Sequence, residues 1–400
     1  MSATLATITP YLKEVYQGRI REQLNTDTKT LKRIMRSSAG VTSEVGGKYV
    51  TFPIHTRRNS GIGSRNELEP LPVPGRQGHA AARVGLKYAY GGIQLTGQAI
   101  ALSDSDPKSF AKSLDNEIDG LKNDLQKDMN RQIYGDGSGA IGTVATAVVG
   151  TNSVVVTDAR LFQIGATVDL VTLPSTVVAV NRTITSISLA TNTIVLSGAV
   201  FTTAIGQIVV RNGSLGREIT GFRSIVASTG TLYNVDPTVE TEWTASEDAN
   251  GGVLRALSEG RMITMADTIR TRGGKTTVIF QSLGVRRAYF NLLSQQRQVV
   301  NEQKFTGGFT GLAFTTDDGE IPTVSDVDAP LNTQWFINED ALTFYRDEEW
   351  SWLDRDGSMW KQVRDANGDY DAYYARMVEY HELGTDRRNT HGVIKDLTEA

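Results

Sequence analysis

Residues 107–134 form the stretch that most constrains the fold. Apolar side chains recur there every three or four positions, a spacing that places them in one stripe along a single long helix. The stripe consists of Phe110, Leu114, Ile118, Leu121, Leu125, Met129 and Ile133. Asp106 and Pro107 suit the start of a helix, and Gly135 suits its end. At about 1.5 Å per residue the helix measures roughly 42 Å, so we expect it to pack on an extended surface.

Charge is unevenly distributed along the chain. The formal net charge is −4, yet residues 1–65 hold eleven Lys or Arg and four Asp or Glu. A basic N-terminal part joined to an acidic remainder predicts contacts between copies of the chain or with an acidic partner. Nucleic acid is a weaker candidate because no basic cluster is interleaved with aromatic residues. A solvated basic helix is the simplest alternative.

The 400 residues include no cysteine, which excludes disulfides, thiolate nucleophiles and cysteine-ligated metals. No apolar run has the length of a signal-peptide core or of a membrane span. We therefore expect a soluble protein that is made in the cytoplasm and has no membrane partner.

A long polar excursion separates two segments with strand character. The segments are KYVTFPI, residues 48–54, and residues 82–99. The 27 residues between them predict an arm that reaches away from its own domain, with a disordered loop as the alternative. Charges of both signs in this arm suit pairing with other subunits. We expect those inter-subunit contacts at Arg57, Arg58, Arg65, Glu67 and Glu69.

Residues 143–212 have a different composition from the rest. Val, Thr and Ile dominate in short runs separated by turn residues, and charged side chains are rare. The charged residues are Asp158, Arg160, Asp169, Arg182 and Arg211. This pattern predicts a small all-β module inserted directly after the turn that ends the long helix.

The remaining C-terminal half combines two patterns. Residues 213–340 alternate strand and helix signals, including a short buried strand at TTVIF and a helix capped by Ser282. Residues 341–400 are rich in aromatic, strand-forming side chains. Asp356-Gly357 and Asn367-Gly368 indicate hairpin turns.

No catalytic constellation is present. The four histidines lack zinc-site spacing, and the glycines after the long helix follow a helix where a dinucleotide site requires a strand. The acidic residues between 317 and 328 lack the spacing of a calcium loop, so we interpret them as a solvated surface. We expect no enzyme activity, no cofactor and no metal.

The order of these elements resembles the major capsid proteins of tailed bacteriophages, whose fold is named after phage Hong Kong ninety-seven and is shared by encapsulin shells. The matching pieces are the N-terminal arm, the loop between KYVTFPI and LKYAYGGIQLTGQAI, the long helix running into YGDGSG, and the terminal stretch DAYYARMVEYHELGTDRRNTHGVIKDL. The resemblance implies an α+β capsid fold with an N-terminal arm, an extended β-hairpin loop, a spine helix, peripheral and axial domains, and an inserted all-β domain.

The resemblance also implies a division of the chain. We expect residues 1–47 as the arm, 48–100 as the extended loop, 101–142 as the spine helix and start of the peripheral domain, 143–212 as the insertion, 213–340 as the axial domain with connecting segments, and 341–400 as the C-terminal peripheral strands and tail. The spine helix would pack through the stripe residues from Phe110 to Met129.

The implied function is a shell of pentamers and hexamers around phage double-stranded DNA, assembled in the host cytoplasm and located in the virion. The implied partners are other copies of the chain, a portal protein at one vertex and packaged DNA through non-specific contacts. A decoration protein is an optional further partner. One branch of the family joins subunits by a lysine-to-asparagine bond from the extended loop, but this loop has no lysine between Lys48 and Lys87. We therefore predict no such bond, because arginine is a poor nucleophile.

In that branch a long helical extension at the N-terminus acts as a built-in scaffold, and this sequence does not show one. We therefore predict a separate scaffolding protein. Three other classes remain as alternatives. An encapsulin-like compartment shares the fold, a tail or baseplate protein would form tubes or rings, and a carbohydrate-active or adhesive enzyme would also use a β module.

Overall fold

The computed structural model describes residues 25–36, 41–42, 49–98, 113–297, 313–316, 319–347, 349–354, 357–365 and 368–400. The chain forms two compact units. The first comprises Met1–Thr26, Tyr90–Gln126 and Trp350–Val378, and the second comprises Asp27–Ala89, Lys127–Glu349 and Glu379–Ala400. Most of the expected N-terminal arm, including all of residues 1–24, lies outside the described residues.

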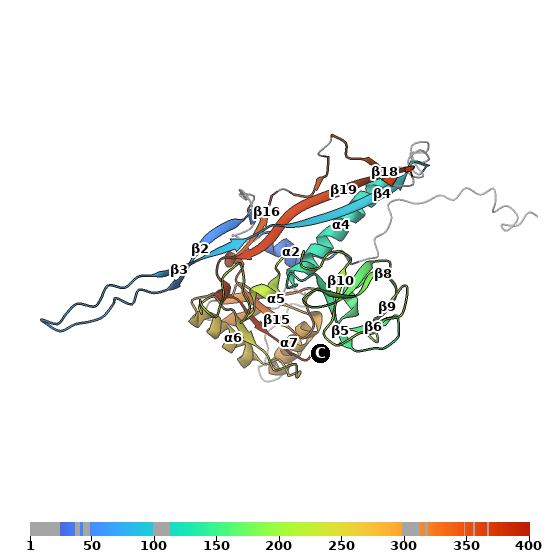
Figure 1. Ribbon diagram of the computed structural model, residues 1–400. Coiled ribbons are helices and arrows are strands. Elements are labelled where there is room, and N and C mark those ends of the chain that lie inside the picture. The colour runs from blue at the N-terminus through green and yellow to red at the C-terminus, as the bar shows by residue number, and fades with distance from the viewer. Residues whose placement is uncertain are drawn as a thin grey trace, which may run out of the picture. The chain divides into compact units, whose positions relative to one another are not determined.

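A helix on a sheet makes up the described part of the first unit (Figure 1). The strands are β4 (Lys87–Thr96), β17 (Ser351–Trp352), β18 (Lys361–Asp365) and the first half of β19 (Gly368–Thr385), and the helix is α4 (Ser113–Ile133) as far as Gln126. Strands β4, β17 and β18 all pair with β19. Asp365 pairs with Gly368, which confirms the hairpin turn expected there. Residues 107–112 of the expected spine helix lie outside the described part.

The extended loop is built on a two-stranded antiparallel sheet in the second unit. Strand β2 (Val50–Arg57) pairs with β3 (Gly78–Val84), from Val50↔Val84 to Arg57↔Gly78. Figure 1 shows these strands and the segments that join them as a long narrow ribbon. The sequence predicts one strand over residues 82–99, but β3 ends at Val84 and β4 begins at Lys87. This correction has a topological reason, because β3 pairs with β2 whereas β4 pairs with β19.

Six short strands close into a barrel after α4. They are β5 (Ala140–Thr146), β6 (Ser153–Val156), β7 (Thr167–Thr172), β8 (Thr176–Ser188), β9 (Thr193–Leu196) and β10 (Ile208–Arg211), with the 3-10 turn η2 (Ala159–Leu161) between β6 and β7. Around the barrel the order is β10-β5-β6-β9-β8-β7. Its interior is filled by aliphatic side chains such as Val154, Leu170 and Ile184. The first strand starts at residue 140, three positions before the expected boundary of the insertion.

The barrel leaves and rejoins the rest of the chain at neighbouring points. Ala140 in the first strand pairs with Val210 in the last. Just outside the barrel, the Gly216 N–H donates to the Ser138 carbonyl over 2.8 Å. Gly139 has φ +87°, and a Cβ atom there would lie 2.5 Å from the Ser214 carbonyl oxygen, so glycine is required at this close approach.

A second lobe follows the barrel and is centred on a six-stranded sheet in the order β11-β20-β15-β12-β14-β13. The strands are β11 (Ser246–Asp248), β12 (Val278–Gln281), β13 (Ala313–Thr316), β14 (Gly319–Ser325), β15 (Gln334–Ile337) and β20 (Gly392–Ile394). The helices are α5 (Phe222–Ile225), α6 (Glu259–Thr271) and α7 (Leu283–Arg297), with the short turns η3 (Glu339–Ala341) and η4 (Arg388–Thr390). Ser282 accepts from the Val285 N–H at the start of α7, as expected of its cap.

The C-terminal stretch contributes strands to two sheets. This corrects the expected boundary at residue 341 between the axial domain and the peripheral strands. Strand β16 (Leu342–Arg346) pairs with the end of β19 and, through Phe344 and Tyr345, with β1 (Val41–Thr42). Strand β20 instead joins the lobe sheet between β11 and β15. Its three residues are buried, because the strand has a partner on each side and α6 packs against it. Residues 213–340 therefore do not form this sheet alone.

Candidate assembly surfaces and the polar networks behind them

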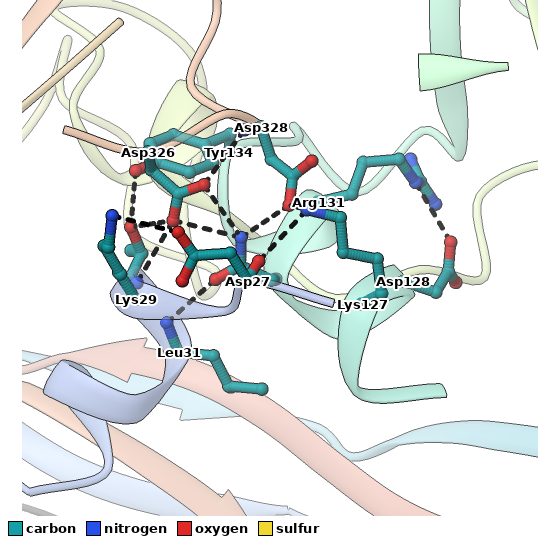
Figure 2. A network of polar contacts seen from close by, with 11 residues as sticks. Asp27, Lys29, Leu31, Lys127, Asp128, Arg131, Tyr134, Asp326 and Asp328 are labelled. Atoms are coloured by element: carbon teal, nitrogen blue, oxygen red, sulfur yellow. Dashed lines mark hydrogen bonds and ion pairs between the residues drawn. The ribbon is translucent and has the colours of Figure 1, made fainter. Parts of the chain in front are cut away.

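The last turns of α4 carry polar side chains into the interior of the second unit. Asn130, Arg131 and Gln132 are 0%, 7% and 9% exposed. Buried polar groups of this kind are stable only when they are hydrogen-bonded. Two networks meet that demand, and Figure 2 shows the first of them together with the Asp128–Arg131 pair of the second.

The first network, here named the Asn130 node, joins α4 to α2 (Lys29–Ile34) and to the loop after β14. The Asn130 side-chain amide donates to Asp326 at 3.1 Å and to Asp328 at 2.6 Å. Its oxygen accepts from the Leu31 N–H at 3.0 Å. One asparagine therefore holds three segments that are far apart in the sequence.

A chain of hydroxyl groups completes the Asn130 node. The Thr30 hydroxyl donates to Asp326 at 2.6 Å, so its contact with the Tyr134 hydroxyl, also 2.6 Å, uses the Tyr134 proton. Burial, together with the charge of Asp326, raises the pKa of Tyr134 and keeps it a donor. Lys127 lies 2.8 Å from Asp328 and supplies the cation. Burial nevertheless raises the pKa of Asp328, although Lys127 and Asn130 oppose the shift.

The second network joins α4 to the end of the barrel. Arg131 contacts Asp128 at 3.0 Å and Glu218 at 2.6 Å. Arg211, the last residue of β10, reaches the same Asp128 at 2.9 Å. Burial opposes ionisation of Asp128, but Arg131 and Arg211 outweigh it and hold its pKa below the ordinary value. The barrel is thus held to α4 by these ion pairs as well as by the chain connection that leads from α4 into β5.

Glu382 is a buried carboxyl group in β19, 2% exposed. It accepts from the Thr220 N–H at 2.6 Å and from the Leu383 N–H at 3.1 Å. Burial raises its pKa from 4.5 to about 8, against the effect of those hydrogen bonds and of Lys87. The folded chain therefore prefers this carboxyl group in its protonated form.

Arg388 is buried in the lobe, where its side chain is 1% exposed. It holds the irregular segment between residues 224 and 243 in place. Its guanidinium donates only to backbone carbonyl groups. The acceptors are Ser224 at 3.0 Å, Ile225 at 3.2 Å, Thr229 at 2.9 Å, Gly230 at 2.9 Å and Trp243 at 3.4 Å. Burial lowers the pKa of Arg388 to about 10. The planar fork of arginine suits this set of acceptors, which no single ammonium group can span.

The predicted spine stripe becomes more buried toward the C-terminal end of α4. Ile118, Leu121 and Leu125 are half-buried, whereas Met129 is 2% exposed. A Cβ atom on Gly91 of β4 would lie 2.9 Å from methyl groups of Leu121 and Leu125, so the helix contacts the strand closely there. Phe110 lies outside the described residues, and Leu114 lies within α4 at a position whose side chain is outside them.

The five predicted contact residues of the extended loop are all exposed. Three of them bind groups of their own chain. Arg57 pairs with Glu240 at 2.8 Å, Arg65 donates to the Pro70 carbonyl at 3.0 Å, and Glu69 accepts from the Asn66 N–H at 3.1 Å. Arg58 and Glu67 lie on the same hairpin, which holds all five on one protruding element.

The extended loop also exposes apolar side chains that the sequence analysis did not single out. Ile62, Leu68, Leu71 and Val73 are 84%, 100%, 84% and 83% exposed. Isolated exposed apolar residues are common on protein surfaces, but four on one narrow loop make it a candidate contact surface. A sequence signal was available, because these residues alternate with glycines, charges and prolines where no local core can form.

The model of one protein family, the SU10 major capsid protein, matches residues 92–398. The chain belongs to this family. It is a phage capsid shell protein and is located in the capsid of the virion.

Solved structures agree with the capsid fold. A chain of the cyanophage A-1(L) capsid asymmetric unit has 15% identity and a TM-score of 0.64, covering 99% of this capsid protein and 100% of that chain. A chain from Mycobacterium phage Bobi has 10% identity and a TM-score of 0.51, and the capsid of a native GTA particle has 10% identity and 0.50; both cover 100% of each chain. No match was found among curated proteins. The predicted fold class and the predicted capsid function are confirmed.

Some features of this capsid protein were not predictable from its sequence. The acidic residues Asp326 and Asp328 were interpreted as a solvated surface, yet they are 2% and 6% exposed within the Asn130 node. This interpretation was wrong because their partners, Thr30 and Asn130, are distant in the chain. Among the described residues, no group of three or more His, Asp or Glu is placed to hold a metal ion. None of the described helices combines the length and the apolar character of a membrane span.

Proposed function

We propose that this capsid protein assembles into the pentamers and hexamers of an icosahedral shell that encloses phage double-stranded DNA. The observation that carries this proposal is the β2–β3 hairpin with its four exposed apolar side chains. Covering each of them on another copy contributes about 1.5 kcal/mol or more, and the contact repeats in every subunit of a shell. Arg57, Arg58, Arg65, Glu67 and Glu69 flank that apolar surface and set its register on the neighbour.

Each part of the chain takes one role in the proposed shell. The sheet around β19 with α4 forms the peripheral domain, and the lobe sheet with α6 and α7 forms the axial domain at the capsomer centre. The barrel is the insertion domain. The extended loop lies across a neighbouring subunit, and residues 1–47 act as a basic arm between subunits.

The shell is assembled in the host cytoplasm with further partners. A separate scaffolding protein sets its size, a portal protein occupies one vertex, and a decoration protein is an optional addition. Packaged DNA touches the shell through non-specific contacts. The chain has no enzymatic step in this scheme, and no covalent bond joins its subunits, so mature particles give a single monomer band on a denaturing gel.

Negative-stain electron microscopy of the chain, expressed with and without its neighbouring genes, tests the proposal. We expect closed polyhedral shells, uniform in size when the helper is present. The double variant Leu68→Asp with Leu71→Asp should lose shells, whereas the control Val239→Asp, 63% exposed outside the loop, should keep them. Soluble monomers or tubes from the wild-type chain in both samples would overturn the capsid assembly scheme.

A further inference from the structure

Two Asn-Gly pairs lie in exposed connections of the described chain. They are Asn212-Gly213 directly after β10 and Asn250-Gly251 shortly after β11. In such a pair the glycine backbone nitrogen can reach the carbonyl carbon of the asparagine side chain, because no Cβ atom obstructs the approach. Both glycines are left-handed, with φ +75° at Gly213 and +63° at Gly251. The two pairs therefore have similar backbones and similar access to solvent, but their hydrogen bonds are different.

The Asn212-Gly213 pair is held by the carboxylate of Asp169. The Asn212 side-chain amide donates to Oδ1 of Asp169 at 2.9 Å, and the Gly213 N–H donates to Oδ2 at 3.1 Å. Burial opposes ionisation of Asp169, but its hydrogen bonds from Asn181, Asn212 and Gly213 outweigh that effect and lower its pKa. One ionised side chain thus binds both the asparagine amide and the glycine nitrogen of this pair.

The Asn250-Gly251 pair is bound differently. Asp396 accepts from the Asn250 N–H at 2.6 Å and from the Gly252 N–H at 3.1 Å, and so passes over the residue between them. Within the described residues the Gly251 N–H donates no hydrogen bond, and a Cβ atom on Gly251 would meet nothing within 4 Å. The Asn250 side-chain amide donates to the Val253 carbonyl at 2.7 Å. The glycine nitrogen is therefore available at this pair and bonded at the other.

We propose that Asn250 is a site of spontaneous deamidation and that Asp169 protects Asn212 from the same reaction. The Gly251 nitrogen bonds to Cγ of Asn250, the Cγ–Nδ2 bond breaks, and ammonia leaves with the proton of the Gly251 N–H. The adjacent position of the two groups favours this ring closure to a succinimide. Water from the solvent then opens the ring. Aspartate forms where the Cγ–N bond breaks, and isoaspartate forms where the backbone C–N bond breaks.

The reaction changes the contact between this turn and the C-terminal segment. Either product adds a negative charge to residues that already bind the Asp396 carboxylate, and like charges repel. Isoaspartate also lengthens the backbone and displaces the two N–H groups that Asp396 accepts. Asp396 follows β20, which lies between β11 and β15 in the lobe sheet. Deamidation should therefore weaken the attachment of the chain that leaves this strand.

Peptide mapping by mass spectrometry tests the proposal on the purified, unassembled full chain. The protein is incubated at mildly alkaline pH, where a deprotonated backbone nitrogen attacks faster, and aspartate plus isoaspartate are quantified at Asn212 and Asn250 over time. We expect Asn250 to convert several-fold faster than Asn212 in the folded subunit. In denaturant, where Asp169 no longer binds the first pair, the two sites should convert at comparable rates.

Two variants examine the two sites separately. Gly251→Ala should slow conversion at Asn250 several-fold and leave Asn212 unchanged, because the added Cβ atom hinders the nitrogen. Asp169→Ala should accelerate conversion at Asn212 and leave Asn250 unchanged.

Equal rates at Asn212 and Asn250 in the folded subunit would overturn the proposal, and so would an Asn250 that stays unmodified. A folded Asp169→Ala subunit in which Asn212 remains as slow as before would contradict protection by Asp169. The comparison of folded with denatured wild type needs no variant, so it decides even where Asp169→Ala does not fold. None of these outcomes depends on shell assembly.

Discussion

Side chains are buried in the Asn130 node and exposed in the extended loop. In the node, Asn130, Thr30 and Asp326 are buried and satisfy one another within a single chain. In the loop, Leu68 and Leu71 are 100% and 84% exposed, and the charged residues beside them also face water. The difference separates side chains that are satisfied within the folded chain from side chains that stay exposed on it.

This contrast follows from the cost of burial. A buried carboxylate that loses its partner is destabilising by several kcal/mol, so a network like the node persists only when it is complete. Exposed apolar groups on a ribbon cost the folded monomer little, because they are also exposed in the unfolded chain. Substitutions in the two regions should therefore separate folding from assembly.

The largest effect is expected from Asn130→Leu. The change leaves Asp326 and Asp328 without their amide donor and the Leu31 N–H without its acceptor. We expect the free energy of unfolding of the unassembled subunit to fall by about 3 kcal/mol or more in chemical denaturation. Lys122→Leu, an exposed position on the same helix, is the control. Equal denaturation midpoints for the two variants would show that the node does not contribute to the stability of the subunit.

A slightly smaller loss is expected from Arg388→Lys. One ammonium group replaces a fork that donates to five carbonyl groups, so several of those acceptors remain buried without a donor. The free energy of unfolding should decrease by about 2 kcal/mol. The neighbouring exchange Arg387→Lys, at an exposed side chain, should change it little. Similar losses for both variants would contradict a special role of Arg388.

An intermediate, pH-dependent effect is expected from Glu382→Gln. Because folding raises the pKa of Glu382 from 4.5 to about 8, the folded state holds a proton that the unfolded state has released. Its contribution to stability is therefore complete below about pH 4.5 and is lost as the pH rises toward 8. The glutamine variant should therefore lose less stability than the wild type over that interval.

Denaturation of unassembled subunits at several pH values measures this difference. Glu242→Gln, the same exchange at an exposed side chain, is the control. A pH dependence of Glu382→Gln that parallels the wild type would show that Glu382 is not the group responsible.

The smallest effect on folding is expected from charge reversal in the extended loop. Arg58→Glu and Arg65→Glu should leave the melting temperature of the subunit unchanged, because both side chains are exposed. The yield of closed shells should fall, whereas Arg286→Glu on the exposed side of α7 should preserve it. Normal shells from the loop variants would restrict the function of the loop to its apolar residues.

Much of the fold could be predicted because it depends on local patterns. The stripe from Ile118 to Met129 indicates α4, and the Val- and Thr-rich runs indicate the strands of the barrel. The break between β3 and β4 could not be predicted, since it depends on a change of pairing partner from β2 to β19.

The polar networks were harder still to predict. Asp326 is 296 residues from Thr30, and Arg388 binds carbonyl groups 163 and 158 residues earlier in the chain. No periodicity or spacing encodes such contacts. The same limit applies to β20, which belongs to a sheet that is otherwise formed by residues 246–337.

The chain enters and leaves the barrel at adjacent positions, so the whole domain can be exchanged for another. Ala140 and Val210 are neighbours across two strands, so the length between them can change without moving either attachment point. Removal of the module would require only a short turn to rejoin residues 139 and 212, and a foreign domain with adjacent termini could replace it. A capsid protein of this design can acquire a new domain at this point in a single genetic step while the rest of its subunit keeps the same connections.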